Sequence, residues 1–532
     1  MPTKYVVILG SMMSGLGKGV VTSSILKLLD LYDYRALPIK FDGYLNYDCG
    51  TMNPFRHGEV FVLDDKSEVD MDFGIYERFS GRDLTGDLSI TGGKLFGSVI
   101  SKERAGDYLG EDVQIIPHLT NEAIGMIEAV ERRRKPDVIV IEVGGTVGDI
   151  ENSYFIEAVR QLALKHQTIF INLTYTPALE VVGEQKTKPA QVGYRLLLQA
   201  GIMPNFVICR SRERLTGKAR EKLALFANIS ETHVIDDSDA KTIYGLPLHF
   251  MEQEFDTMLI KELGLKAQRL NRAKLGSWKE KVNIIENPKG RLRVAVVGKY
   301  TGLRDSYASI KEALVHAGVP IRKGVDIKWI EAERLEGKGA SPALLKDADA
   351  LIVPGGFGKR GTEGMINAIR YARENGLPFL GICLGMQLMA VEYARNVCKL
   401  RGAASAEFEK DAAHKVISLM DEQKGVKSKG ATMRLGLWKC RLPLRESIAY
   451  SAYGKRLIGE RHRHRYEFNN SYRGILERHG LVISGTTTDK RLVEFIEWSS
   501  GFGIGTQAHP ELRSRLEQPA PLFAALLKAA SK

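Results

Sequence analysis

Short apolar runs that have the length of buried β-strands recur along this chain and alternate with longer helical stretches. In the N-terminal half these runs lie at residues 5–9, 113–116, 138–143, 168–173 and 205–209. Strands that alternate with helices pair in parallel, and the helices cover the sheet. The N-terminal half is therefore predicted to form a mostly parallel α/β sheet.

A second series of the same kind follows a polar, basic stretch that contains Gly276, Pro288 and Gly290 as helix and strand breakers. Its strand-like runs lie at residues 292–297, 326–330, 350–353, 378–382, 481–484 and 492–497, and its helical stretches include 307–316 and 364–375. A chain of 532 residues also exceeds what one core normally holds. We expect two doubly wound, mostly parallel α/β domains, at residues 1–265 and 292–532, joined by a linker at 266–291.

Composition narrows the class of protein. No apolar run approaches the roughly 20 residues that span a bilayer, so we expect no membrane partner, and the run at 5–9 reads as a first strand and not as a signal peptide. Five scattered cysteines without a C-x-x-C spacing favour a reducing cytoplasm. The net charge of +12 suits nucleic acid or polyanionic nucleotides, and the lack of a nucleic-acid-binding signature favours nucleotides.

A glycine-rich turn, Gly10 to Gly19, follows the first strand and precedes a helical stretch at 20–31. Such a turn directs backbone N–H groups at a phosphate, and Lys18 adds a positive charge. It departs from a strict Walker A motif, because Met12 replaces a glycine and Gly19 replaces the hydroxyl residue that would hold magnesium. The turn is predicted to bind phosphate; the alternative is a tight turn with an incidental lysine.

Two acids are candidate magnesium ligands in place of that hydroxyl. Glu142 ends the apolar run 138–141, where open α/β sheets bind ligands, and Asp72 lies in a polar segment. Glu142 could instead be a turn acid, and Asp72 alone could be an ordinary loop acid. The segment 186–191 places two lysines before an extended X-Pro unit, which suits a triphosphate or a solvated basic loop.

A possible nucleophile lies between the run 378–382 and the next helix. Cys383 has a glycine two residues to either side, which is the cysteine form of a nucleophile elbow. His509 could accept its proton, and Glu511 could orient the imidazole. The Gly356 N–H, in the loop 354–358, is the candidate oxyanion donor. Alone, Cys383 could be a structural cysteine and His509 a structural histidine.

Together these segments resemble the CTP synthase family along nearly the whole chain. The elbow, the loop 354–358 and His-Pro-Glu alone would indicate only a class I glutamine amidotransferase domain. The segments 14–19, 46–62, 76–79 and 186–191 are more specific to the family. The resemblance implies a P-loop NTPase-like synthase domain fused to that amidotransferase domain.

The resemblance implies a role for each matching position. It implies ATP contacts from Gly15, Leu16, Gly17, Lys18, Gly19, Val20, Asp72, Ser238, Asp239 and Ala240. It implies UTP or CTP contacts from Ser14, Lys40, Asp149, Ile150, Glu151, Lys186, Thr187, Lys188, Pro189, Ala190, Gln191 and Lys222, with residues 149–151 at the site where CTP acts as feedback inhibitor. It implies glutamine contacts from Gly356, Leu384, Gly385, Met386, Gln387, Glu407 and Arg465.

It further implies Mg²⁺ ligands at Asp72 and Glu142, ammonia entry at His57, and a homotetramer. GTP is the implied allosteric activator, through the lid Thr432 to Gly436, with Arg360 and Glu363 joining it. Some positions depart from the usual family residues: Ser11, Gly43, Cys49, Val192, Gly193, Ala227 and Met365. The first of these stands where a glycine is usual, and Val192 and Gly193 replace a usual His-Ser pair.

The activity that the resemblance implies is amination of UTP. ATP would phosphorylate the uracil 4-oxygen and ammonia would displace the phosphate, with Lys18, Lys40 and magnesium neutralising charge. A sheltered route for ammonia is expected, because bulk water would protonate it. One alternative is another amidoligase such as a cobyric acid synthase, against which the segment 186–191 argues. Another is a non-catalytic assembly or nucleic-acid-binding protein, which would lack Cys383, His509 or Lys18.

Overall fold

The computed structural model describes residues 2–53, 57–179, 184–302, 304–337, 341–419 and 433–532. The chain divides into two compact units. The first comprises Met1–Cys49 and Ile75–Val282, and the second comprises Gly50–Gly74 and Asn283–Lys532. The sequence patterns gave no sign that residues 50–74 leave the first unit, and the limits 1–265, 266–291 and 292–532 stay a prediction about domains.

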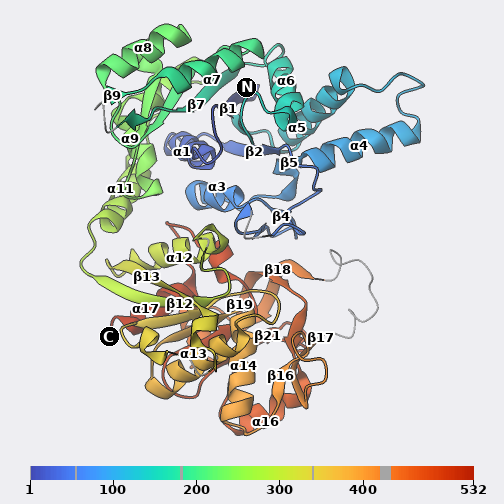
Figure 1. Ribbon diagram of the computed structural model, residues 1–532, viewed down its shortest axis with the longest axis vertical. Helices are drawn as coiled ribbons and strands as arrows, with labels where there is room; N and C mark the ends of the chain where they lie inside the picture. Colours follow the sequence, from blue (N-terminus) through green and yellow to red (C-terminus); the bar gives the residue numbers. More distant parts are fainter. Residues whose placement is uncertain (1, 54–56, 180–183, 303, 338–340, 420–432) are drawn as a thin grey trace. The chain divides into compact units, whose positions relative to one another are not determined.

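The first unit has a seven-stranded sheet in the order β11-β10-β7-β1-β6-β2-β5 (Figure 1), and every neighbouring pair is parallel. Its strands are β1 Lys4–Gly10, β2 Ala36–Asp42, β5 Ser89–Thr91, β6 Val138–Val143, β7 Thr168–Tyr175, β10 Phe206–Ser211 and β11 Val234–Ser238. The predicted parallel sheet is confirmed, with strands at four of the five predicted runs.

The predicted strand at 113–116 is wrong. Residues 113 and 114 have no regular structure, and Ile115–Leu119 forms a short helical turn. Ile115 and Ile116 are about half exposed, so burial in a core does not stabilise a strand there. Pro117 also lacks the N–H that a sheet hydrogen bond needs. A four-residue apolar run does not by itself define a strand.

Helices cover the first sheet: α1 packs on β1, β2 and β6, α7 on β7, and α8 and α9 on β11. The helices are α1 Lys18–Leu31, α4 Gly92–Ala105, α5 Thr120–Arg134, α6 Ser153–Leu162, α7 Lys188–Gln199, α8 Gly217–Ala227, α9 Leu246–Glu252 and α10 Phe255–Glu262. Two more, α3 Asp72–Ser80 and α11 Arg272–Glu286, each run across a boundary between the units.

The second unit has a nine-stranded sheet in the order β13-β12-β14-β15-β23-β22-β21-β18-β19. Its parallel part is β13 Gly324–Glu331, β12 Arg291–Gly298, β14 Ala350–Val353, β15 Phe379–Ile382 and β23 Gly503–Thr506. Its antiparallel part adds β22 Val493–Glu497, β21 Val482–Thr487, β18 Arg434–Arg441 and β19 Leu457–His464. The sheet is therefore mixed, with the parallel part carrying the predicted nucleophile.

The remaining elements of the second unit include the predicted helices at 307–316 and 364–375, observed as α12 and α13. The helices are α12 Ala308–Gly318, α13 Thr362–Asn375, α14 Leu384–Asn396, α15 Ile448–Tyr453, α16 Arg473–Arg478 and α17 Pro521–Ala530. Short strands are β3 Phe61–Val62, β4 Glu68–Val69, β16 Ala403–Ser405, β17 His414–Leu419 and β20 Tyr466–Phe468; β8 Ala178–Leu179 and β9 Glu184–Gln185 belong to the first unit.

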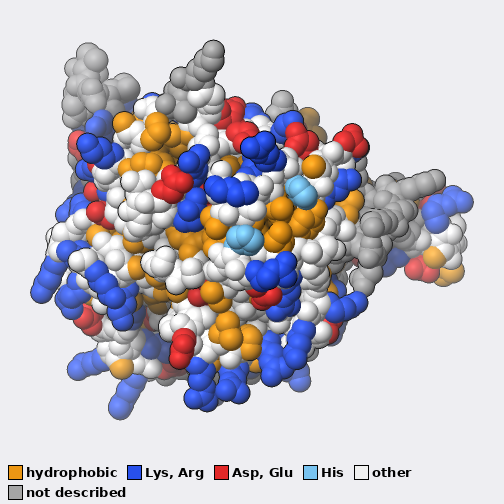
Figure 2. Space-filling model, turned by 90° about the horizontal axis from the view of Figure 1, so that it is seen from below, with side chains coloured by type: hydrophobic (Ala, Val, Ile, Leu, Met, Phe, Trp, Pro, Cys, Tyr) orange, Lys and Arg blue, Asp and Glu red, His pale blue; other side chains and the backbone are white. Residues whose placement is uncertain are grey.

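The distribution of surface charge and the apolarity of the helices bear on nucleic-acid and membrane partners. Lys and Arg side chains are spread over the face shown in Figure 2, between acidic and apolar side chains, and do not form one stripe on that face. Among the described residues, no helix combines the length and the apolarity that crossing a membrane requires.

The stretch predicted as a linker contains α11, whose Trp278 is fully buried in the first unit. Its Nε1–H donates to the Tyr244 carbonyl at 2.9 Å, and its ring lies 5.6 Å from that of Phe79. The Lys27 ammonium lies 4.5 Å from the centre of the indole. This part of the predicted linker is therefore part of a core.

Trp278→Ala should lower the free energy of unfolding of the first unit by about 3–5 kcal/mol, because it removes a large buried ring and leaves a cavity. Urea unfolding followed by circular dichroism measures the change. Trp438→Ala is the matched control, since Trp438 is 38% exposed and its loss should cost little. Equal unfolding midpoints for the two variants would contradict a core role for α11.

Candidate active sites

The glycine-rich turn lies at the carboxyl end of β1, where the structure has the strand–turn–helix arrangement that the sequence predicts. Gly17 caps α1 with φ of 91°, a left-handed conformation that glycine adopts without steric cost. Lys18 is buried, and its Nζ donates to the Gly145 carbonyl at 2.6 Å. A Cβ on Gly10 would lie 2.8 Å from this Nζ. The turns after β1 and β6 therefore meet at a buried ammonium.

Glu142 lies beside them near the end of β6 and is 2% exposed. It accepts hydrogen bonds from the Thr22 hydroxyl at 3.0 Å and from the Tyr76 hydroxyl. Lys40 pairs with it across β2 and β6, with Nζ 3.7 Å from Oε1. A buried carboxylate at the carboxyl edge of the sheet fits the oxygen donors that Mg²⁺ prefers. Asp72, the other predicted ligand, begins α3 and belongs to the second unit.

The predicted extended segment around Pro189 is instead the start of a helix. Thr187 has helical φ/ψ as the N-cap, α7 begins at Lys188, and the proline occupies the first turn, where its missing N–H costs nothing. Lys186 pairs with Glu184 at 2.8 Å, and the buried Gln191 amide donates to the Thr187 hydroxyl at 3.1 Å.

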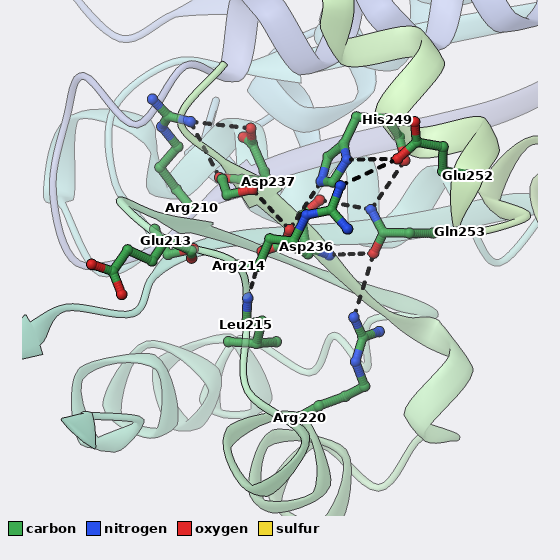
Figure 3. Close-up of polar contacts among 12 residues, drawn as sticks. Arg210, Glu213, Arg214, Leu215, Arg220, Asp236, Asp237, His249, Glu252 and Gln253 are labelled. Carbon is green, nitrogen blue, oxygen red and sulfur yellow. Dashed lines mark hydrogen bonds and ion pairs between the residues drawn. The ribbon is translucent and has the colours of Figure 1, made fainter. Parts of the chain in front are cut away.

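The other predicted nucleotide residues lie in neighbouring turns. Leu16 is buried and Gly15 and Ser14 are exposed in the first turn, while Gly19 and Val20 lie in α1. Ala190 is buried in α7, and Lys222 of α8 lies 4.0 Å from Glu184. Asp149, Ile150 and Glu151 are exposed after β6. Ser238 ends β11, and Asp239 and Ala240 follow it; Figure 3 shows the polar contacts of the neighbouring Asp236 and Asp237.

Ser11 fills the space into which a side chain at position 193 would point. Ser11, in the turn after β1, is fully buried. A Cβ added to Gly193, in α7, would lie 2.4 Å from both Cβ and Oγ of Ser11. A side chain at position 193 would therefore compete with Ser11 for the space between the first turn and α7.

In the second unit, Cys383 joins β15 to α14 in a strained turn, with φ of 52° and ψ of −101°. Its backbone N–H donates to the Thr506 carbonyl at 2.7 Å, and its side chain is buried. A Cβ on Gly385 would lie 2.0 Å from the Val353 carbonyl oxygen, so only glycine fits the close approach of α14 to β14. These are the features of a nucleophile elbow.

His509 lies next to Cys383. A Cβ built on Gly355 would lie 3.6 Å from both Cys383 Cβ and His509 Nε2. On the other side of the ring, Nδ1 lies 2.7 Å from Glu511 Oε1. Burial opposes a charged imidazole, but the charges of Glu511 and Cys383 outweigh it and raise the pKa of His509 well above its ordinary value. The arrangement therefore favours a protonated imidazole beside the Cys383 side chain.

A cavity of about 80 Å³ opens beside these two side chains. Its lining includes Gly355, Gly356, Phe357, Cys383, His509, Glu511, Tyr300, Ser306, Tyr307, Ile310, Arg463, Leu512, Glu59 and Val60. Gly356 therefore lines the same cavity as Cys383, and its role as an oxyanion donor stays a prediction. Most of the other lining residues were not predicted, because isolated tyrosines and arginines carry no motif.

The predicted glutamine contacts surround the same elbow. Glu407 Oε1 accepts the Gly358 N–H at 2.9 Å. Gln387 is buried, and its Nε2 lies 3.3 Å from Gln507 Oε1, whose own amide lies 3.7 Å from Cys383 Sγ. Leu384 and Met386 are buried under the elbow, and Arg465 lies between β19 and β20. Gln507 is a neighbour of the nucleophile that sequence reasoning missed.

The segment 57–69 belongs to the second unit and reaches this cavity through Glu59 and Val60. Glu59 Oε2 accepts the Ser309 N–H at 3.1 Å. Two ion pairs hold the segment on β19: Arg461 to Asp64 at 2.6 Å and Arg463 to Glu68 at 2.7 Å. His57, the predicted ammonia entry, begins it. These contacts join residues far apart in the sequence, which local patterns do not reveal.

The predicted GTP lid is partly outside the described residues, which omit Thr432 and also 54–56 of the segment 46–62. Arg434 begins β18 and pairs with Glu494 at 2.6 Å. Arg360 pairs with Glu333 at 3.1 Å, and Glu363 pairs with Arg395 at 2.9 Å, so these two candidates have separate partners. Within the described ranges, no group of three or more His, Cys, Asp or Glu is placed to hold a metal.

Comparisons with known proteins match both halves of the chain. The family model described as CTP synthase N-terminus matches residues 4–265, and the model described as glutamine amidotransferase class-I matches residues 303–529. A CTP synthase of Caldanaerobacter subterraneus is 47% identical over 530 residues, covering 99% of this chain and 98% of the relative. One of Geobacillus kaustophilus is 46% identical over 534 residues, covering 100% of both.

A solved glutaminase domain of a Trypanosoma brucei CTPS with bound acivicin is 37% identical. It covers 45% of this chain and 94% of its own, with a TM-score of 0.43.

Gly193→Ser should destabilise the first unit by about 1–3 kcal/mol, because the new side chain overlaps Ser11. The double variant Ser11→Gly/Gly193→Ser should regain most of the loss. Thermal or urea unfolding of the two single variants and the double variant gives the coupling energy. A double variant no more stable than Gly193→Ser would show that the two side chains do not compete for space.

In the pH profile of kcat/KM for glutamine hydrolysis, Glu511→Gln should move the alkaline limb to lower pH. The carboxylate helps to hold the pKa of His509 high, so its loss lets the imidazolium lose its proton at lower pH, where it can no longer act as an acid. Stopped assays of glutamine hydrolysis over a range of pH values measure the position of this limb. The profile of ammonia-dependent synthesis is the control and should stay unchanged; an unmoved glutaminase limb would contradict the assigned role of Glu511.

Proposed function

This chain belongs to the CTP synthase family, and from that premise we propose that Cys383, His509 and Glu511 are its glutaminase triad. The protein is a glutamine-hydrolysing CTP synthase: it aminates UTP to CTP with ATP, and its amidotransferase domain supplies ammonia from glutamine. The observation that carries the proposed triad is the strained backbone of Cys383, which presents a thiol beside an imidazole that is itself paired with a buried carboxylate.

In the proposed reaction the Cys383 thiolate attacks the carboxamide carbon of glutamine. The oxyanion faces the N–H groups of Gly356 and Leu384, and His509 gives its proton to the leaving ammonia. Water then attacks the thioester with His509 as base, releasing glutamate and restoring the thiol. Glutamine and water thus yield glutamate and ammonia.

In the proposed synthase reaction the γ-phosphoryl group of ATP moves to the uracil 4-oxygen, and ammonia then displaces phosphate from C4. Lys18, buried at the meeting of two turns, and Lys40, paired with Glu142, are suited to neutralise phosphate charge. Glu142 and Asp72 are the residues that would hold Mg²⁺, which supplies further charge neutralisation on the phosphates. ADP, phosphate and CTP are the products.

The remaining assignments are supported by resemblance. ATP would contact residues 15–20 and 238–240, UTP residues 186–191, and CTP would inhibit at 149–151. GTP would activate through the lid around Gly436, and ammonia would enter the synthase site at His57. A homotetramer without nucleic-acid or membrane partners is the proposed form. A reducing cytoplasm agrees with five cysteines that are buried and form no disulfide.

Cys383→Ala should lower glutamine-dependent CTP formation by about a thousandfold or more, because no thiolate remains to form the thioester. With ammonium salt at a pH that leaves free ammonia, the variant should form CTP at close to the wild-type ammonia-dependent rate. A coupled assay with UTP, ATP and either nitrogen source measures both rates.

Lys18→Ala is the matched control, because it should abolish CTP formation from either nitrogen source. Full glutamine-dependent synthesis by Cys383→Ala would refute the triad. Loss of ammonia-dependent synthesis in a folded Cys383→Ala protein would instead refute the separation of the two reactions.

A further inference from the structure

A polar network beneath the carboxyl ends of β10 and β11 centres on Asp236 (Figure 3). This carboxylate is buried and joins three segments. Oδ1 accepts the Leu215 N–H at 3.0 Å, from the turn after β10. Oδ2 accepts the Ser238 hydroxyl at 2.9 Å, from the end of β11, and lies 2.9 Å from Nε2 of His249 on α9. One side chain therefore fixes the strand end relative to a helix and a turn.

Helix α9 also holds the backbone of the same residue. The Gln253 side chain accepts the Asp236 N–H at 2.8 Å and donates to the Asp236 carbonyl at 2.9 Å. His249 is oriented from behind by Glu252, whose Oε2 lies 3.6 Å from Nδ1. We call His249 and Gln253 the clamp, because together they hold Asp236 in β11, two residues before Ser238.

Each partner of the His249–Asp236 contact favours the charged form of the other. Burial alone would raise the pKa of Asp236, but hydrogen bonds from His249, Ser238 and the Leu215 N–H outweigh it and lower that pKa. The hydrogen bond with Asp236 raises the pKa of His249, even though burial opposes its charge. A charge-assisted hydrogen bond of this kind is stronger and shorter than a neutral one.

The segment that follows the clamp is Ser238, Asp239 and Ala240, which leaves the sheet and is exposed from Asp239 onward. Arg210 forms a second anchor, with its guanidinium 3.2 Å from Asp237 Oδ1 and 2.5 Å from Asp239 Oδ1. An exposed segment that binds a ligand loses less conformational entropy on binding when its base is already fixed.

We propose that His249 is a positioning residue for ATP: through Asp236 it fixes the base of the segment 238–240, which contacts the nucleotide. The proposal rests on the assignment of that segment to ATP under the proposed function. Ser238 links the two directly, because its hydroxyl is bonded to the carboxylate that His249 holds.

The test compares His249→Ala with His249→Gln, measuring KM for ATP and for UTP in ammonia-dependent synthesis. His249→Ala should raise KM for ATP about tenfold, as losses of supporting hydrogen bonds around a site commonly do. KM for UTP, kcat at saturation and glutamine hydrolysis should stay near wild type. His249→Gln keeps an N–H donor near the position of Nε2 and should restore most of the affinity.

His233→Ala is the matched control. His233 precedes β11 at its other end, where its ring stacks on Phe206 at 4.7 Å, so its loss disturbs the same strand without reaching residue 238. Unchanged KM for ATP in His233→Ala supports the proposal. An equal rise in both histidine variants, or an equal rise for ATP and UTP in His249→Ala, overturns it.

KM for UTP has to be measured separately, because the turn 213–216 connects Asp236 to the segment predicted to bind UTP. The Leu215 N–H of this turn donates to Asp236. The Thr216 N–H donates to Gln185 at 2.8 Å, one residue before the predicted UTP contact Lys186. Ala240→Phe separates the two proposals. If it raises KM for ATP and His249→Ala does not, the positioning role fails alone. If neither variant changes KM for ATP, the assignment of 238–240 to ATP fails as well.

Discussion

The glutaminase half of this protein depends on one strained residue. Two contacts hold Cys383 at φ of 52°. Its backbone N–H donates to the Thr506 carbonyl, and the first turn of α14 packs so closely on Val353 that only a glycine fits at position 385. Such a conformation persists only when its surroundings determine it. The parallel strands β14, β15 and β23 supply those surroundings, and the antiparallel strand β19 carries Arg463 to the same cavity.

Sequence patterns predicted what local chemistry determines. The strands at 138–143 and 350–353 coincide with β6 and β14, and the phosphate turn and the cysteine elbow lie where their motifs place them. Strands β2 and β11 were missed because Lys40, Asp42, Asp236 and Asp237 interrupt their apolar pattern. Lys40, Asp236 and Asp237 are each buried with a partner from another segment, whereas Asp42 is buried beside Lys40 and the Tyr44 hydroxyl. Compensation by a distant partner has no signature in a single sequence.

In the candidate sites, too, residues with a local motif were predicted and residues that depend on distant partners were not. Cys383, His509 and Glu511 were recognisable because chemistry dictates their types and spacing. Glu59, Arg463 and Gln507 were not, because an isolated acid, arginine or amide gains its meaning from a partner far along the chain. The helix at Pro189 was mistaken for an extended segment for a related reason: proline is compatible with both, and burial of Ala190 and Gln191 decides between them.

The membership of residues 50–74 in the second unit has a topological consequence. The chain passes between the units three times, after Cys49, Gly74 and Val282, so no single cut separates them. A fragment that begins at residue 292 retains the elbow but lacks Glu59 and Val60 from the cavity lining. The architecture is therefore interlaced rather than modular: moving the amidotransferase to another synthase by end-to-end gene fusion would leave part of its active-site wall behind.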